Sequence, residues 1–174
     1  MALDVSPNYA SDSTLALTTY VGKIMVSRDR GETWQLTMNG VEVPRLNGSF
    51  EPSYQDPRRF FDIAFSPTYG RDQTLFTTGL WTKFLRSTNG ARSWSLHALS
   101  QEVRGLTLLL SPGFDTDKTL YIGNQAGQLF RSPNGGRRFA TVANLPWERG
   151  NDSPSMVISP GFVAARALYT VADT

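Results

Sequence analysis

Two short phrases recur along this chain at a shared interval, and this repetition constrains the fold more than any other feature. The first phrase has three copies, at Ser27–Trp34, Ser87–Trp94 and Ser132–Phe139. The second, Ser-Pro-x-Tyr/Phe, begins at residues 6, 66, 111 and 159. Successive copies lie 60 and 45 residues apart in both phrases, and 48 residues separate the last two Ser-Pro copies. Two unrelated phrases in step with each other predict a repeat protein.

Apolar residues alternate with polar ones around both phrases, which is typical of half-buried β-strands. In each repeat, strand A precedes Ser-Pro, strand B follows it, strand C leads into the first phrase and strand D leaves it. Strand A is predicted at Leu3–Val5, Phe61–Phe65, Leu106–Leu110 and Met156–Ile158. Strand B is predicted at Leu15–Thr18, Leu75–Thr78, Leu120–Gly123 and Leu168–Val171. Strand C is predicted at Lys23–Val26, Lys83–Arg86 and Gln128–Arg131, and strand D at Thr33–Thr37, Ser93–His97 and Arg138–Val142. No helix is predicted.

Four antiparallel strands in a repeat of this length indicate an all-β fold of β-propeller blades, with about three and a half blades in the chain. We expect one domain over residues 1–174, with blades at about 1–40, 60–99 and 105–143 and a half blade at 154–174. An incomplete ring leaves strand edges unpaired. The chain is therefore expected to be part of a larger propeller, and the alternative is that several chains complete the ring as an oligomer. Either way, further blades or a protein partner are expected at the open edges.

The copy at Ser27–Trp34 resembles the Asp-box, or BNR, repeat of sialidases, sortilin-type receptors and photosystem assembly propellers. The family pattern is Ser-x-Asp-x-Gly-x-Thr-Trp, and this copy matches it fully. The second copy has Asn89 for Asp and Ala91 for Gly, and the third has Asn134 for Asp and Phe139 for Trp. The resemblance covers nearly the whole chain. It implies a propeller, and it slightly favours an extracytoplasmic or secreted protein.

The repeated phrases are interpreted as structural turns. A short Ser or Asp side chain accepts hydrogen bonds from exposed turn amides, Gly takes a positive φ, and the closing aromatic side chain enters the core. The residues with this predicted role are Ser27, Asp29, Gly31, Trp34, Ser87, Asn89, Trp94, Ser132, Asn134, Gly136 and Phe139. Asp12, Asp72 and Asp117 have the same role in the Ser-Pro phrase. Both phrases are expected at one end of the sheets, because A–B and C–D connections share an end.

The composition narrows the function classes. The formal charge is only +2 and no Lys/Arg run exists, so we expect no nucleic-acid partner. The chain has no Cys and one His, which argues against a metal or another cofactor. No apolar stretch has the length of a membrane span, and the first residues lack the pattern of a signal peptide.

The B–C and D–A loops, at the other end of the sheets, hold the predicted ligand site. Aromatic residues beside arginines and carboxylates suit a sugar or a peptide, and an acidic glycan or a peptide is the expected ligand. The candidates are Arg58, Arg59, Arg104, Arg149, Trp81, Trp147 and Tyr54. Two rivals stay open: a solvated rim, and an internal ion-pair cluster with the nearby carboxylates Asp56, Glu102, Glu148 and Asp152.

The predicted function is a non-catalytic binding or assembly module for a protein or a carbohydrate. The alternative is a fragment of a glycoside hydrolase, whose chemistry needs paired carboxylates across the scissile bond. Sialidases of the resembled family use an Arg cluster, a Tyr–Glu pair and an Asp, but no motif assigns those roles to residues of this chain. We therefore predict no catalytic residue, and the expectation leans against an enzyme.

Overall fold

The computed structural model describes residues 1–19, 21–41, 60–79, 83–98, 105–124, 126–145, 155–159 and 168–171. These residues form three four-stranded antiparallel sheets and a two-stranded one, with neighbouring strands in chain order. Sheet 1 contains β1 (Ala2–Val5), β2 (Leu15–Thr18), β3 (Ile24–Ser27) and β4 (Gln35–Leu36). Sheet 2 contains β5 (Phe60–Phe65), β6 (Leu75–Gly79), β7 (Lys83–Ser87) and β8 (Ser95–Ala98). Sheet 3 contains β9 (Gly105–Leu110), β10 (Leu120–Asn124), β11 (Gln128–Ser132) and β12 (Ala140–Asn144). Sheet 4 contains β13 (Ser155–Ile158) and β14 (Leu168–Val171).

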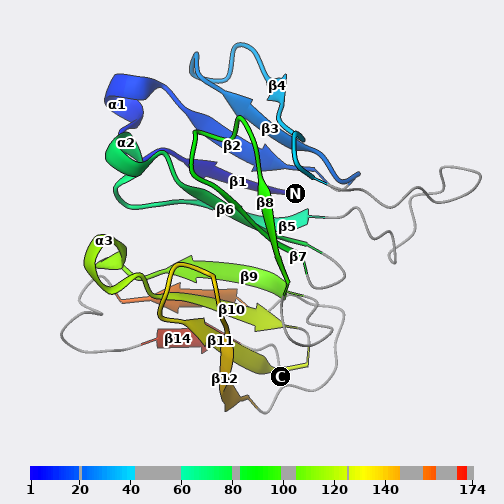
Figure 1. Cartoon of the computed structure of the whole chain (residues 1–174), viewed down its shortest axis with the longest axis vertical. Helices are drawn as coiled ribbons and strands as arrows, with labels where there is room; N and C mark the ends of the chain where they lie inside the picture. Colours follow the sequence, from blue (N-terminus) through cyan, green and yellow to red (C-terminus); the bar gives the residue numbers. More distant parts are fainter. Residues whose placement is uncertain are drawn as a thin grey trace, which may run out of the picture.

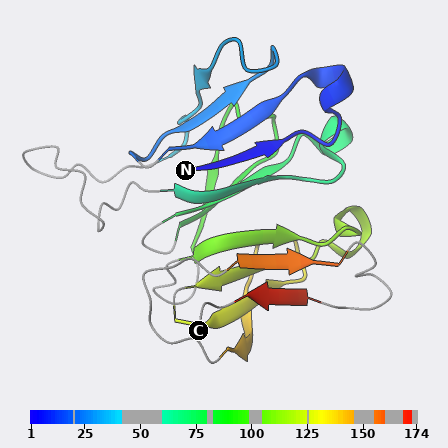
Figure 2. The same cartoon turned by 180° about the vertical axis from the view of Figure 1, so that it is seen from behind.

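The sheets stack face to face, and their first strands β1, β5, β9 and β13 lie side by side (Figures 1 and 2). We call the contacts between successive sheets junctions 1–2, 2–3 and 3–4. Each junction has its own apolar core. Junction 1–2 buries Ala16, Ile24, Val26, Ile63, Phe65, Leu75, Leu85 and Trp94. Junction 2–3 buries Phe76, Phe84, Leu108, Phe114, Leu120, Ile122 and Phe130, and junction 3–4 buries Tyr121, Leu129 and Met156.

Among the described residues, three one-turn helices follow the first three Ser-Pro copies, although the sequence predicted none. They are α1 (Tyr9–Asp12), α2 (Tyr69–Asp72) and α3 (Phe114–Asp117). In the first, the Ser6 hydroxyl donates to Asp12 at 2.6 Å, and the same carboxylate accepts the N–H of Thr14 at 2.9 Å. The other two repeat this pattern. Four residues are too few to show helical periodicity in the sequence, so local side-chain bonds define these helices.

We call Ser27–Trp34, Ser87–Trp94 and Ser132–Phe139 turn motifs 1, 2 and 3. Each turn motif bonds to the residue that directly follows the short helix of its own sheet. The N–H of Arg30 donates to the carbonyl of Ser13 at 3.1 Å, and Gly90 donates to Gln73 at 2.9 Å. Gly135 likewise donates to Lys118 at 2.9 Å. Both repeated phrases therefore lie at one end of the sheets, as the antiparallel order predicts.

One face of sheet 1 is uncovered within the described part of the chain. Leu3 is 55% exposed and Val5 is 43% exposed, whereas Ile63 and Phe65, at the same positions of sheet 2, are 3% and 6% exposed. Trp34 on this face is half-buried, which differs from the core position that the sequence predicts. The difference follows from coverage, because a face is buried only where the preceding sheet packs on it.

No helix among the described residues is long and apolar enough to span a membrane.

Candidate functional site

None of the ligand-binding residues predicted from the sequence can be placed, because all of them lie outside the described residues. They are Tyr54, Arg58, Arg59, Trp81, Arg104, Trp147 and Arg149. Their role in binding therefore stays a prediction. The described residues nevertheless contain a pocket, two bridging carboxylates and a basic cluster, all at the junctions between sheets.

Turn motif 1 uses its polar side chains locally. The Ser27 hydroxyl accepts the N–H of Gly31 at 2.8 Å and donates to Asp29 at 2.7 Å. Asp29 also accepts the N–H of Thr33 at 2.9 Å and the hydroxyl of the same residue. The bonds from Thr33, and then the one from Ser27, lower the pKa of Asp29 to about 2. Since its oxygens already accept these bonds, Asp29 is suited to holding the turn.

Turn motifs 2 and 3 reach the same geometry with asparagine. The amide oxygen of Asn89 accepts the N–H of Ser93 at 3.0 Å, and that of Asn134 accepts the N–H of Arg138 at 3.0 Å. The Ser87 hydroxyl accepts the N–H of Ala91 at 2.9 Å. Ala91 has a φ of 64°, so it occupies the left-handed region that Gly favours in the family pattern.

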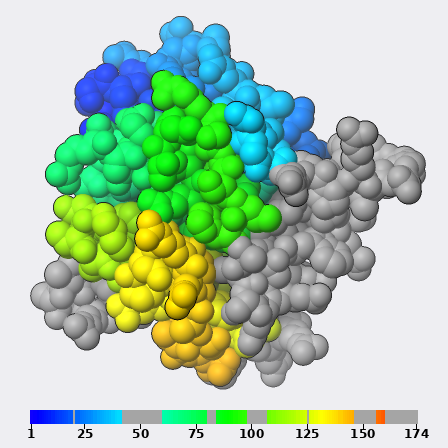
Figure 3. All heavy atoms as spheres, in the orientation of Figure 1, coloured from blue at the N-terminus to red at the C-terminus, as the bar shows by residue number. Residues whose placement is uncertain are grey.

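A pocket of about 400 Å³ opens at junction 1–2, on the side of β4 and turn motif 2. Its wall is formed by Arg28, Gln35, Leu36, Thr37, Met38, Asn39, Ala91 and Arg92. Two hydrogen bonds from Trp94 hold this region together. Its backbone N–H donates to the carbonyl of Asn39 at 2.9 Å, and its indole N–H donates to the carbonyl of Thr37 at 2.8 Å. In the space-filling view, light-blue atoms of the segment after β4 lie against the green atoms of sheet 2 (Figure 3).

Two guanidinium groups in the pocket wall are oriented by carbonyl groups. Arg28 donates from Nη2 to the carbonyl of Gly90 at 2.6 Å, and from Nη1 to the side chain of Gln35 at 3.3 Å. Arg92 donates from Nη1 to the carbonyl of Asn89 at 3.1 Å. An arginine has five N–H donors, so donors remain on both groups. Among the described residues, neither arginine forms a salt bridge.

The internal repeats supply a signal for this site that the sequence prediction missed. Arg28 stands where the other two turn motifs have Thr88 and Pro133, so the arginine is a departure from the repeat. Arg92 has Arg137 as its counterpart in turn motif 3. The sequence alone does not show that Arg28 reaches turn motif 2, because this contact joins residues 62 positions apart.

Two carboxylates bridge the first strands of neighbouring sheets. Asp4 accepts the N–H of Phe65 at 2.8 Å, and Asp62 accepts the N–H of Leu108 at 2.7 Å. Each also accepts the N–H of the residue that follows it. These first strands are sheet edges with unpaired N–H groups, so each aspartate links one edge strand to the edge strand of the next sheet.

The bridging positions are partly desolvated, and this affects the charge of both groups. Burial raises the pKa of Asp62 to about 6, against the opposite effect of the bonds from Leu108 and Ile63, and the Asp4 carboxylate raises it further. Burial also raises the pKa of Asp4. A pair of nearby carboxylates in different environments is the arrangement that glycoside hydrolysis uses. Here, however, each carboxylate already accepts two backbone N–H groups.

Comparison with known proteins gives structural likeness only. No family model matches the chain, and no curated protein matches it either. YCF48 from Cyanidioschyzon merolae superposes with a TM-score of 0.58 at 21% identity, over 86% of this chain and 38% of that one. A structure of YCF48 bound to D1 peptide gives 0.55 at 18% identity, over 81% and 40%. The GH74 xyloglucanase from Xanthomonas campestris gives 0.61 at 18% identity, over 83% and 21%.

At these identities the likeness establishes the fold and not the activity. This chain spans about two fifths of the YCF48 chains and about a fifth of the xyloglucanase. The three four-stranded sheets and the half sheet are antiparallel and stacked in chain order, as blades are. The chain is therefore an all-β, partial β-propeller.

Proposed function

We propose that this chain is part of a non-catalytic β-propeller, of the Asp-box kind, that binds a protein partner through an acidic segment. The observation that carries this proposal is the pocket at junction 1–2, where Arg28 and Arg92 present N–H donors beside apolar side chains. Guanidinium groups recognise carboxylates through charge-assisted, often bidentate hydrogen bonds.

The rest of the pocket wall suits a peptide. Its volume of about 400 Å³ lies within the range of small-ligand sites. Leu36 is 57% exposed and Met38 is half-buried beside it, so the wall offers apolar area to a side chain of the ligand. The amides of Gln35 and Asn39 both donate and accept hydrogen bonds, as the backbone of an extended peptide requires. The likeness to YCF48 bound to D1 peptide supports a protein ligand on such a fold.

A glycoside hydrolase fragment is the second candidate, because the chain also resembles the GH74 xyloglucanase. Asp4 and Asp62 are its best described residues, since the Asp4 carboxylate contributes to the raised pKa of Asp62. Their hydrogen bonds to the backbone of the next sheet favour a structural role instead. Incubation with xyloglucan and release of reducing ends tests this candidate, and turnover by wild type that Asp62→Asn abolishes would favour the enzyme.

The binding proposal is tested by affinity. A set of fluorescein-labelled ten-residue peptides, each with one Glu, is titrated against wild type and variants by fluorescence polarisation. A D1 peptide is included in the set. Arg28→Ala and Arg92→Ala each remove charge-assisted hydrogen bonds worth about 1.5–3 kcal/mol, which weakens binding roughly 10- to 100-fold. Arg28→Lys keeps the charge but loses the fork geometry, so its effect is intermediate.

Arg30→Ala is the matched control. It removes one positive charge from turn motif 1, but Arg30 is not part of the pocket wall. Equal Kd values for wild type, Arg28→Ala and Arg92→Ala would refute the pocket. In that case Arg59→Ala and Arg104→Ala test the ligand site that the sequence predicts in the B–C and D–A loops.

The uncovered face of sheet 1 supports a second kind of contact within the same proposal. Leu3, Val5 and the half-buried Trp34 occupy positions that are packed at the junctions between the other sheets. We propose that a further blade-like sheet covers this face, either from additional sequence of the same protein or from an assembled copy. Sedimentation velocity over a range of concentrations tests assembly by copies. Wild type that stays a monodisperse monomer, with a Leu3→Ser variant that sediments in the same way, would contradict it.

A further inference from the structure

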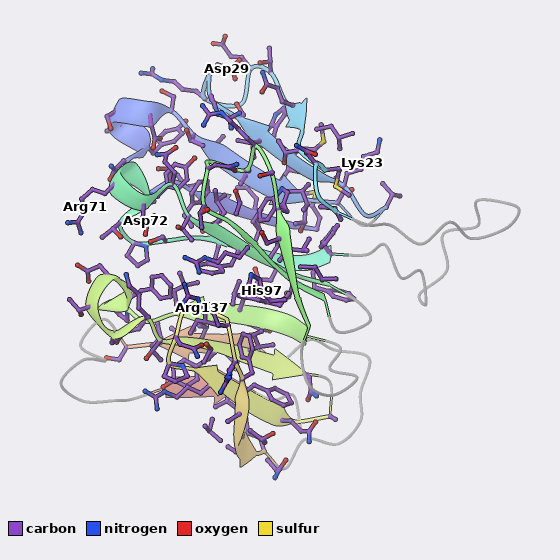
Figure 4. The ribbon with its side chains drawn as sticks, viewed as in Figure 1. Lys23, Asp29, Arg71, Asp72, His97 and Arg137 are labelled. Atoms are coloured by element: carbon purple, nitrogen blue, oxygen red, sulfur yellow. The ribbon has the colours of Figure 1, made fainter. Side chains whose placement is uncertain are left out.

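A basic cluster at junction 2–3 has no function in the fold described above. It consists of Arg86 on β7, His97 on β8 and Arg137 in turn motif 3, and Figure 4 labels the last two between sheets 2 and 3. The three groups are close enough to act on one another. Desolvation and then Arg86 and Arg137 lower the pKa of His97, and desolvation and then Arg137 lower the pKa of Arg86.

This cluster lacks negative charge. Nε of Arg86 is buried and has no hydrogen-bond partner within the described part of the chain. Its guanidinium lies 5.9 Å from the centre of the Phe76 ring, a cation–π contact that fixes its position. Among the described carboxylates, only Asp72 acts on Arg86 in the opposite direction to Arg137. A buried donor without an acceptor is unfavourable, and an anion bound at the exposed part of the cluster reduces the repulsion among its cationic groups.

The cluster is the counterpart, one sheet further on, of the pocket at junction 1–2. Arg137 occupies the position of Arg92 in its turn motif, and His97 occupies the position of the pocket residue Thr37. Because both pairs stand at equivalent positions of successive sheets, the two sites lie on the same side of the stack.

A guanidinium from the preceding sheet also meets the same turn glycine at both junctions. Arg28 bonds to the carbonyl of Gly90. Nη1 of Arg86 lies 3.7 Å from the point where a Cβ atom on Gly135 would stand, and Gly135 is the glycine equivalent to Gly90. The two arginines come from different sequence positions, Arg28 after β3 and Arg86 within β7. A basic pair therefore occurs twice in succession, although the repeat itself does not require it.

We propose that Arg86, His97 and Arg137 form a second anion-binding subsite, which takes a second carboxylate of the same ligand that binds at Arg28 and Arg92. This inference rests on the proposed function. It makes the partner an extended acidic segment with two carboxylates, one at each of two successive junctions. Two anchor points on one chain raise the affinity through effective concentration, without any new kind of contact.

The test uses fluorescein-labelled peptides of sixteen residues in a Gly/Ser background, with either one Glu or two Glu separated by two to ten residues. Kd is measured for wild type, Arg137→Ala, Arg28→Ala and the control Arg138→Ala. Arg137 and Arg138 are adjacent, exposed and equally charged, and Arg138 lies outside the proposed subsite. Wild type is expected to bind the best two-Glu peptide at least tenfold more tightly than the one-Glu peptide.

The variants separate this inference from the proposal on which it rests. Arg137→Ala is expected to remove the gain of the second Glu, while Arg138→Ala keeps it and Arg28→Ala weakens both kinds of peptide. If Arg137→Ala binds the two-Glu peptide within twofold of wild type while Arg28→Ala weakens it, the second subsite is wrong and the proposed function stands. If wild type binds no peptide, both are wrong.

Discussion

Trp94 and Trp34 occupy the same position in two turn motifs, but only Trp94 is covered by a preceding sheet. Trp94 is 4% exposed and donates its indole N–H to Thr37 across junction 1–2 at 2.8 Å. Trp34 is half-buried and donates to Gly31 within its own turn at 3.1 Å. Truncating each to Ala therefore measures how much of the stability comes from the packing of one sheet on the next.

We expect a large difference between the two variants. Removal of a fully buried Trp costs about 3–5 kcal/mol, and the carbonyl of Thr37 additionally loses its partner in Trp94→Ala. Trp34 is more exposed than Trp94 and its indole N–H bonds only within its own turn, so Trp34→Ala should cost clearly less. Trp94→Phe keeps most of the packing and loses the bond, so its cost is expected near 1–2 kcal/mol.

Urea denaturation followed by tryptophan fluorescence and far-ultraviolet circular dichroism gives the free energy of unfolding of each variant. Trp94→Phe is the fallback if Trp94→Ala does not fold. Equal losses of stability in Trp34→Ala and Trp94→Ala would refute the reasoning, because they would mean that the face carrying Trp34 is as well covered as junction 1–2.

Three further predictions use the same measurement. Asp62 has a folded-state pKa of about 6, above its unfolded value, so the stability of wild type relative to Asp62→Asn should fall as pH rises from 4 through 6. A stability difference that does not change with pH would contradict the raised pKa. Asp29 has a folded-state pKa of about 2, so wild type should lose stability relative to Asp29→Asn as pH falls from 4 towards 2, and a loss of equal size in the variant would contradict this. Asp72→Ala leaves the hydroxyl of Ser66 and the N–H of Thr74 without their acceptor, so it should cost about 1–3 kcal/mol, and no measurable cost would contradict the role of the α2 turn.

The repeated phrases predicted the sheets because strand alternation and turn chemistry are local properties of the sequence. Strands predicted at Leu15–Thr18 and Leu168–Val171 have those same bounds in the structure. Strand D of the first repeat, predicted at Thr33–Thr37, shortens to Gln35–Leu36, since Asp29 holds Thr33 in the turn. The blade limits proposed for the domain stay a prediction.

The pocket and the basic cluster were not predictable in the same way. Taken alone in the sequence, Arg28, Arg92 and Arg137 suit solvent-exposed turns and Arg86 suits a strand. Only the stacking of sheets brings Arg28 to Gly90 or Arg86 to Gly135. The bridging role of Asp4 and Asp62 has the same origin, because the N–H groups that donate to them lie 61 and 46 residues further along the chain. Junction contacts depend on the register between sheets, which the repeat interval does not specify.

The residues that differ between repeats are therefore the more informative ones for function. Positions that all repeats share, such as the serine that opens each turn motif, are accounted for by bonds within the turn. Arg28 aligns with Thr88 and Pro133, and Arg86 aligns with Val26 in sheet 1 and with Arg131 in sheet 3. Folding does not require a guanidinium at these positions, because other sheets fold without one. Yet both side chains reach equivalent glycines of the next turn motif. Convergence of two unrelated positions on one geometry is the argument for the proposed ligand that spans both junctions.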